Sequence, residues 1–404
     1  MQQATSKPMI SEGVLIAILA AINFTHIMDF VMMAPLSATL KIEMSISTKE
    51  FGYLVSVYTF AAALGAIIAF FNIDKYDRRT AVIFLYTGFI VANVLCALAP
   101  QYKFFMMARL FAGLFGGVLN VLIMSVIGDV IPLERRGKAM GKIMSAFSAA
   151  SVIGIPSGLI LANMYKDYHA PFWLLSGLSL IVGITILLKF PSIKRHLEFT
   201  GEKTPPLQIL KEFAQNPNVI RSLLFISILM IAGFSVVPFL SDYLVNNVGL
   251  DIEELKYVYL CGGLATVFSS ILVGRLSDKF GKVKTFVAAA LISIIPIAGA
   301  TVLPAMPLMY VLMFNVVFFM CFGARFVPAM TLMTSCIMPH RRGSFLSISS
   351  AIQQLASGIA VMIASTIIVN GAKGELYYFG WVGVVACTAT VLSIILSLRI
   401  KEVS

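Results

Sequence analysis

A short charged loop occurs twice in this 404-residue chain, and each copy lies between two long apolar segments. The first copy, IDKYDRR, runs from Ile73 to Arg79, and the second, GRLSDKFGK, runs from Gly274 to Lys282. The aspartates of the two copies, Asp74 and Asp278, are 204 residues apart, close to half the length of the chain. The chain is therefore a duplication, and a duplicated helical bundle places a binding site between its two halves.

The composition places most of the surface in lipid. Hydrophobic residues make up 59% of the chain and charged residues only 12%, whereas a soluble domain carries about 25% charged residues. The five cysteines lie in apolar runs without metal-ligand spacing (Cys96, Cys261, Cys321, Cys336 and Cys387). We interpret them as small buried hydrophobic residues, and we expect neither a cofactor nor a metal.

Twelve segments reach the length of about 20 apolar residues that a membrane span requires. Helices are the expected spanning elements, because open strands would leave backbone groups unpaired in lipid. The expected spans are 13–36, 51–72, 80–99, 103–130, 138–163, 171–190, 219–247, 254–276, 284–303, 306–335, 343–369 and 376–398. We therefore predict an all-α membrane protein, with a six-helix bundle over 1–190, a cytoplasmic linker over 191–218 and a second six-helix bundle over 219–404.

The basic residues orient the chain. Of the 30 Lys and Arg residues, 22 fall in one set of loops and chain ends and six in the opposite set, while Arg109 and Arg325 lie inside spans. This asymmetry places both termini in the cytoplasm, and the compact loops favour a bacterial inner membrane. The net charge of +11 then faces anionic lipid, so nucleic acid is not needed as a partner. The linker is expected to be a tether, or to lay an apolar stripe over 207–213 on the membrane surface.

The twelve spans in two sets of six, the central linker and the loop after spans 2 and 8 together resemble the major facilitator superfamily, whose loop pattern is G-x-x-x-D-[RK]-x-G-[RK]-[RK]. The resemblance covers essentially the whole chain. The second copy matches the pattern at Gly274, Asp278, Lys279, Gly281 and Lys282. The first copy keeps Asp74, Lys75, Arg78 and Arg79, but has Phe70 and Asp77 where the pattern has glycine.

A second loop is also repeated. IPLERRG at 131–137 links spans 4 and 5, and MPHRRG at 338–343 links spans 10 and 11. Carboxylates at span ends cap helices and pair with nearby arginines, so these loops are predicted to close the cytoplasmic side in the outward-open state; the alternative is that they only set the orientation. The predicted cytoplasmic gate consists of Asp74, Arg78, Asp129, Arg136, Asp278, Lys279 and Arg342.

Two further patterns suggest a branch of the family. Span 4 contains RLFAGLFGG, with Arg109, and looks like the arginine-bearing span of proton-coupled members. Span 5 contains SVIGIPSG, which partly resembles the antiporter motif G-P-x-x-G-G. The nearest resemblance is to the drug and sugar efflux branch, similar to arabinose-efflux-type permeases. That resemblance implies a proton antiporter.

Ionisable groups within spans are costly and usually functional. Asp29 of span 1 lies about seven residues from the outer end, and Arg109 of span 4 lies at similar depth. We predict that Asp29 binds the transported proton, since burial disfavours its charge while Arg109 favours it; the alternative is a purely structural pair. His26 shares the helix face of Asp29 and either relays the proton, binds substrate or is a neutral structural histidine. Asp242 of span 7, by contrast, is expected to reach water.

Arg325 of span 10 needs a partner at its depth in the membrane. Asp29, a backbone carbonyl or an anionic substrate could serve, and Arg325 is the predicted substrate residue if the substrate is anionic. Other polar residues within spans complete the predicted substrate-binding set: Asn23, Tyr58, Asn120, Asn315, Gln353 and Gln354. We expect a few of them to contact ligand and the others to hydrogen-bond between helices.

The residues bear on three classes of function. A proton-coupled exporter of small organic molecules working by alternating access accounts for Asp29. An importer or exchanger of an anionic metabolite recognised by Arg325 is the alternative. A membrane enzyme or receptor lacks support, because the four histidines are scattered and no Walker loop or HExxH motif occurs. The expected partners are a small molecule, protons and lipid, and the expected working unit is a monomer.

Overall fold

The computed structural model describes residues 10–194, 197, 205–338 and 341–402. In that part of the chain the regular secondary structure is helical except for one two-stranded hairpin. Twelve of the described helical segments are long and apolar enough to cross a membrane. The predicted all-α fold with twelve spans is therefore confirmed, with the small hairpin as the addition that the sequence did not predict.

The first half of the chain, the N-half, contains α1 to α8, and span 5 is divided by a π-helical turn, η2. Its elements are α1 (Glu12–Val31), α2 (Ser37–Glu43), α3 (Thr48–Asn72), η1 (Ile73–Lys75), α4 (Arg78–Ala97), α5 (Tyr102–Val130), α6 (Leu133–Ala149), η2 (Ala150–Gly154), α7 (Ile155–Tyr165) and α8 (His169–Lys189). Span 1 was predicted to reach residue 36, but α1 ends at Val31 and a turn leads into the short helix α2.

The second half, the C-half, follows the linker helix α9 (Pro206–Gln215). Its elements are α10 (Pro217–Phe234), η3 (Val237–Phe239), α11 (Leu240–Tyr243), η4 (Leu244–Val248), η5 (Ile252–Glu254), α12 (Leu255–Phe280), α13 (Lys282–Ala300), α14 (Leu308–Ser335), α15 (Arg342–Ile367), β1 (Val369–Asn370), β2 (Leu376–Tyr377) and α16 (Phe379–Ser397). The strands pair antiparallel, with Val369 opposite Tyr377.

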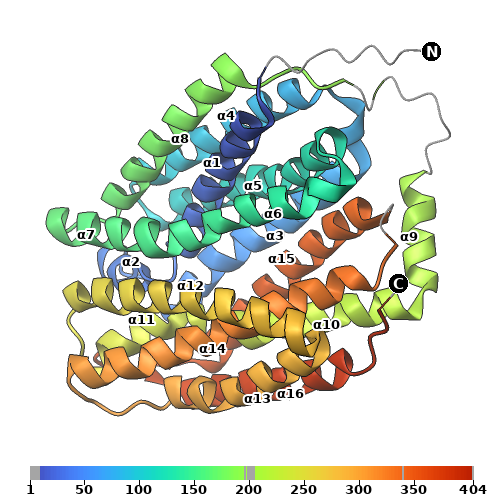
Figure 1. Ribbon diagram of the computed structural model, residues 1–404. Coiled ribbons are helices and arrows are strands. Elements are labelled where there is room, and N and C mark those ends of the chain that lie inside the picture. The colour runs from blue at the N-terminus through green and yellow to red at the C-terminus, as the bar shows by residue number, and fades with distance from the viewer. Residues whose placement is uncertain (1–9, 195–196, 198–204, 339–340, 403–404) are drawn as a thin grey trace, which may run out of the picture.

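The two halves lie side by side, with α3 of the N-half packed along α15 of the C-half (Figure 1). One end of the molecule carries α9, the loops after α3 and α5, the start of α1 and the end of α16 (Figure 1), and we call it the linker end. The opposite end carries α2 and the β1–β2 hairpin, and we call it the hairpin end. The linker end is the one predicted to face the cytoplasm.

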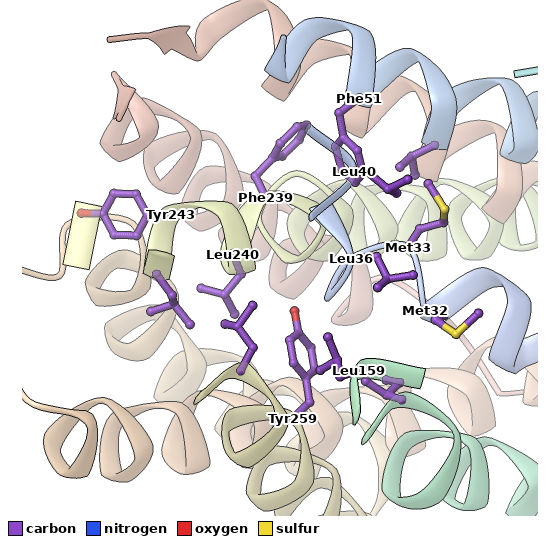
Figure 2. Packing of buried hydrophobic residues seen from close by; sticks show 14 of the residues in the cluster. Met32, Met33, Leu36, Leu40, Phe51, Leu159, Phe239, Leu240, Tyr243 and Tyr259 are labelled. Carbon is purple, nitrogen blue, oxygen red and sulfur yellow. The ribbon is translucent and has the colours of Figure 1, made fainter. Parts of the chain in front are cut away.

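Apolar packing differs between the two ends. At the hairpin end, one buried cluster combines side chains of both halves, including Met33 and Phe51 with Phe239 and Tyr259 (Figure 2). Phe51 and Phe239 meet edge to face, with ring centroids 6.1 Å apart. At the linker end, the described buried residues form two separate clusters, one in the N-half that also includes Ala351 and one in the C-half with α9.

Glycines bring α3 and α5 into close contact in the N-half. A methyl group added at Gly113 would lie 2.2 Å from the carbonyl oxygen of Tyr58, and one at Gly117 would lie 2.0 Å from that of Ala62. Small residues are the usual means of close helix packing in membranes. The glycines of RLFAGLFGG therefore position α5, and with it Arg109, directly against α3.

The linker helix α9 packs on the C-half. Ile209 and Phe213 are buried, and the Phe213 ring meets Phe345 of α15 at 5.9 Å. Glu212 of α9 pairs with Arg341 at 2.9 Å. These two apolar residues of the 207–213 stripe are thus buried in the apolar cluster of the C-half and not in lipid, whereas Leu207 is exposed.

Candidate functional site

Asp29 and Arg109 form an ion pair inside the N-half. Arg109 Nη1 donates to Asp29 Oδ1, and the two side chains are 1% and 0% exposed. Burying two charges costs several kcal/mol each, and their attraction offsets this cost only when the geometry is good. In the described structure Asp29 Oδ2 and Arg109 Nε have no hydrogen-bond partner, so the pair is close but incompletely satisfied.

The ring of Tyr58 forms one wall of this pair. The guanidinium carbon of Arg109 lies 4.2 Å from the ring centroid, a cation–π contact of about 0.5–2 kcal/mol. Phe30 also stacks on the Tyr58 ring, with centroids 5.7 Å apart. Tyr58, predicted as a substrate residue, is therefore positioned first of all to hold Arg109.

His26 lies one turn before Asp29 on α1. It is 6% exposed, and neither ring nitrogen has a partner among the described residues. Its ring lies against Gly116, where an added methyl group would be 2.8 Å from Cδ2. The structure thus places His26 beside the pair, and none of the hydrogen bonds found for described residues joins it to Asp29.

The other polar candidates take different partners. Asn23 donates to the carbonyl of Ile143 at 3.1 Å and so ties α1 to α6. Asn315 donates to Val311 of its own helix at 3.0 Å. The Asn23 amide thus joins two helices, whereas the Asn315 amide bonds within α14.

Asn120 and the two glutamines lie closer to the boundary between the halves. Asn120 donates to Ser350 Oγ across that boundary at 2.9 Å. Gln353 donates to Ser349 Oγ at 3.4 Å. Gln353 and Gln354 are half-buried on α15, so these three side chains stay candidates for contact with ligand.

Arg325 is a buried guanidinium in the C-half. Its side chain is fully buried, and Nη1 donates to Thr390 Oγ1 of α16 at 3.2 Å. The ring centroid of Phe322 lies 5.1 Å from its guanidinium carbon. None of the ion pairs formed by described residues includes Arg325, and Asp29, one expected partner, is paired with Arg109 instead.

Comparison with known proteins identifies the family. Residues 19–361 and 223–403 match the family described as Major Facilitator Superfamily. The chain belongs to the major facilitator superfamily. It is a multi-pass membrane transporter and, as the sequence indicated, not an enzyme.

Relatives are similar over much of this transporter. The "Uncharacterized MFS-type transporter YceJ" of Bacillus subtilis (strain 168) is 26% identical over 340 residues, which cover 83% of this chain and 84% of that protein. The "Probable sugar efflux transporter" of Helicobacter acinonychis (strain Sheeba) is 24% identical over 267 residues, 66% of each chain. The crystal structure of a D-xylose-proton symporter has a TM-score of 0.75 at 16% identity, covering 94% of this chain and 96% of that one, which shows the shared fold.

In this transporter three of the predicted gate residues of the N-half bind one another, and the fourth, Arg136, binds backbone carbonyls. Arg78 pairs with Asp74 at 2.6 Å and with Asp129 at 2.7 Å, and it donates to the carbonyl of Ile73. Arg136 donates to the carbonyls of Ile131 and Gly128. All these contacts stay within the N-half.

The gate residues of the C-half are less engaged. Asp278, Lys279 and Arg342 are exposed, and none of them takes part in an ion pair between described residues. Gly281 ends α12 with φ +91°, a conformation that glycine adopts without strain. Pro339 and His340 of the second repeated loop lie outside the described residues.

Where the first loop has Asp77 in place of glycine, the carboxylate forms local hydrogen bonds. Asp77 accepts from Arg79 N at the start of α4, from Ile193 N and from Ser192 Oγ. Burial opposes the charge of Asp77, but these hydrogen bonds hold its pKa below the ordinary value. The departure from the family pattern thus fastens the end of α8 to the start of α4.

Sequence reasoning missed a second buried charge pair, at the hairpin end. Lys41 of α2 donates to Asp242 Oδ2 of α11 at 2.5 Å, with the side chains 8% and 1% exposed. Two further hydrogen bonds complete the network: Lys41 donates to Thr48 Oγ1, and Asn246 donates to Asp242 Oδ1. Asp242, expected to reach water, is instead buried, because α2 folds over it from the other half. The available signal was that both residues lie at the same ends of spans 1 and 7, which are equivalent in the duplication.

Proposed function

We propose that this transporter exports a small organic molecule in exchange for protons, by alternating access between its halves, with the linker end in the cytoplasm. The observation that carries the proposal is the buried Asp29–Arg109 pair in spans 1 and 4. A carboxylate held in such a place by a single guanidinium changes its surroundings greatly when it gains or loses a proton.

Protonation of Asp29 removes the charge that compensates Arg109. The guanidinium then keeps the Tyr58 ring, whose attraction is about 0.5–2 kcal/mol and smaller than the several kcal/mol that a buried charge costs. Arg109 is therefore driven to find water or another acceptor, and the contact between α1 and α5 weakens.

The position of Asp29 connects this change to the hairpin end. Asp29 lies two residues before α1 ends at Val31, and the turn that follows leads into α2. α2 carries Lys41, which pairs with Asp242 of the C-half. A movement of the end of α1 thus bears on the contact between the two halves, which is the coupling that proton exchange requires.

Efflux as the direction has two supports. One similar protein is named a probable sugar efflux transporter. In addition, SVIGIPSG, which partly resembles the antiporter motif, contributes its first four residues to the π-turn η2, and a methyl group at Gly263 of α12 would lie 2.7 Å from the carbonyl oxygen of Ser151 in that turn. π-turns within helices are frequent at functional sites, and this one lies where spans 5 and 8 meet.

The test is substrate-dependent proton movement into proteoliposomes that contain a pH-sensitive dye. The panel consists of uncharged sugars, chloramphenicol and small carboxylates. A substrate that moves protons with the wild-type protein is expected to move none with Asp29→Asn, because that side chain cannot release a proton. Glu253→Gln, an exposed carboxylate at the hairpin end, is the matched control and is expected to behave as wild type.

Undiminished proton movement in Asp29→Asn would overturn the coupling role. A small carboxylate of the panel that crosses the membrane without protons would instead favour a second candidate, import or exchange of an anionic metabolite. That candidate has one specific support, the Arg325 guanidinium without a carboxylate partner among the described residues.

A further inference from the structure

We propose that the C-half binds a carboxylate group of the transported molecule at Arg325, in the place that Asp29 occupies in the N-half. The inference rests on the proposed transport function and names the chemical class of the substrate. It depends on the internal repeat, on the surroundings of Arg325 and on which of its donor atoms are free.

The internal repeat places Gly233 opposite Asp29. The duplicated loop has an offset of 204 residues, and the same offset relates Asp29 to Gly233 and Phe30 to Phe234. Phe30 and Phe234 contact each other, with ring centroids 5.4 Å apart. Equivalent residues that touch lie on the axis relating the two halves, so the offset of 204 holds at this point of spans 1 and 7.

Gly233, like Asp29, lies beside a buried arginine, but it has no carboxylate to pair with it. A methyl group added at Gly233 would lie 3.6 Å from Arg325 Nη2. Arg325 is not the repeat equivalent of Arg109. With the offset of 207 that relates Pro132 to Pro339, the equivalent of Arg109 is Val316, so the two arginines come from different turns of their helices. Each half therefore has a buried arginine beside this position of its first span, but only the N-half supplies the carboxylate.

The free donors of Arg325 suit a carboxylate. Nη1 already donates to Thr390 Oγ1, whereas Nε is buried without a partner among the described residues. Nε and Nη2 form one edge of the guanidinium, which is the edge that binds a carboxylate through two parallel hydrogen bonds. Nη2 is the nitrogen that faces Gly233, so this edge points to the missing acid.

Phe322 covers the same place. Its ring lies over the guanidinium, and its Cε2 would be 2.8 Å from a methyl group at Gly233. Because this contact is made by the end of the Phe322 side chain and not by backbone atoms, the ring can rotate away from the space beside Gly233. The Phe322 ring thus partly stabilises the Arg325 guanidinium when no carboxylate is bound. An incoming carboxylate takes the place of the ring.

The experiment measures binding of radiolabelled benzoate to the purified transporter in nanodiscs, with neutral benzamide and chloride as competitors. Benzoate is expected to bind the wild type and benzamide to compete poorly. Arg325→Gln is expected to weaken benzoate binding roughly 10-fold to 100-fold, the range for losing hydrogen bonds to a charged group. Gly233→Asp, which supplies the missing acid from the protein itself, is expected to weaken it by a similar factor.

Gly233→Ala is the matched control, because it adds the first carbon without the charge, and it is expected to keep benzoate binding. Absence of benzoate binding in the wild type, equal binding in Arg325→Gln, or equal loss in Gly233→Ala and Gly233→Asp would each overturn the proposal. Chloride competing as well as benzoate would show an inorganic anion site and overturn the carboxylate assignment. Because only binding is measured, these failures are separate from failure of proton coupling at Asp29.

Discussion

The two ends of the boundary between the halves are built differently. At the hairpin end, one apolar cluster runs through both halves, and the buried pair Lys41–Asp242 crosses between them. At the linker end, the apolar residues form two clusters, and the ion pairs of Arg78 stay within the N-half. Of the described residues near that end, Asn120 and Ser350 supply the one side-chain hydrogen bond between the halves.

This difference shows that the transporter is closed at the hairpin end. A buried ion pair is about neutral overall compared with hydrated charges, but it is strongly unfavourable when only one partner remains. Such a pair suits a contact that must form and break repeatedly, since both groups regain water when the end opens. At the linker end, the charged groups of the N-half loops pair within that half, and Asp278, Lys279 and Arg342 of the C-half are exposed to solvent. None of these groups ties one half to the other through an ion pair between described residues, so the halves can separate at this end.

The largest expected effect is that of Lys41→Met. It leaves the Asp242 carboxylate buried and unpaired, which should disfavour the closed hairpin end by about 3–5 kcal/mol. The measurement is the distance between spin labels at Lys49 and Glu253, exposed residues of opposite halves at this end, which should lengthen. Lys103→Met, which removes an exposed lysine at the same end, should leave the distance unchanged, and an unchanged distance in Lys41→Met would refute the role of the pair.

The double variant Lys41→Met/Asp242→Leu sharpens the comparison. Replacing a whole buried ion pair by apolar residues is often neutral or stabilising, so the short spin-label distance should return. The recovery is a coupling between the two sites, which a double-mutant cycle measures. A double variant as open as Lys41→Met would mean that the lysine acts through something other than Asp242.

Gly52→Ala should open the same end by a smaller amount. A methyl group at Gly52 of α3 would lie 2.4 Å from Ser365 Cβ of α15, and overpacking of this kind costs about 1–3 kcal/mol. The same pair of labels reports the change. Gly141→Ala, where an added methyl group meets nothing within 4 Å, is the control and should leave the distance as in wild type.

At the linker end, Asn120→Ala removes the hydrogen bond to Ser350 and should favour separation of the halves by about 0.5–1.5 kcal/mol. Spin labels at Lys75 and Lys279, exposed residues of opposite halves, should show a modest shift toward longer distances. Ser125→Ala, which removes a hydrogen bond within α5, is the matched control. A shift as large as that of Lys41→Met at the other end would mean that the linker end holds the two halves together as strongly as the hairpin end does.

The smallest effect on the halves is expected from Asp77→Ala, because its hydrogen bonds stay within the N-half. Loss of this cap should lower stability by about 1 kcal/mol without moving either pair of labels. The pKa of Asp77 is held below its ordinary value, so its contribution is present above the pKa of the unfolded chain and is lost as pH falls through the folded pKa. Thermal unfolding of wild type and variant should therefore converge at acidic pH, and a constant difference would exclude the charge as the cause.

Much of the fold could be predicted because lipid imposes it. Twelve apolar segments of sufficient length must become helices, and the duplicated loops divide them into two sets of six. The position of Asp29 relative to Arg109 was also accessible, since depth in a span follows from counting residues. The end of α1 was placed too late because the apolar run continues through the turn at 32–36 into α2.

The polar candidates show where prediction stopped. Asn23 and Asn315 looked like ligand groups from their place in spans, yet their amides bind backbone carbonyls. An amide in lipid must find some partner, and the sequence does not say whether that partner is a ligand or a neighbouring helix. For the same reason the burial of Asp242 was not predicted, since its partner Lys41 lies 201 positions away in the chain.

By itself, the sequence determined the duplication, the spans, the distribution of charge between the two ends and the residues that carry charge inside lipid. The proximity of Asp29 to Arg109 was expected from the sequence, but only the tertiary structure decided the other partners: Lys41 pairs with Asp242, and Arg325 pairs with neither aspartate. The physical reason is that depth in the membrane is a local property of one apolar segment. Pairing, by contrast, depends on which helix faces which, and that is set by close packing of glycines and side chains from segments far apart in the chain.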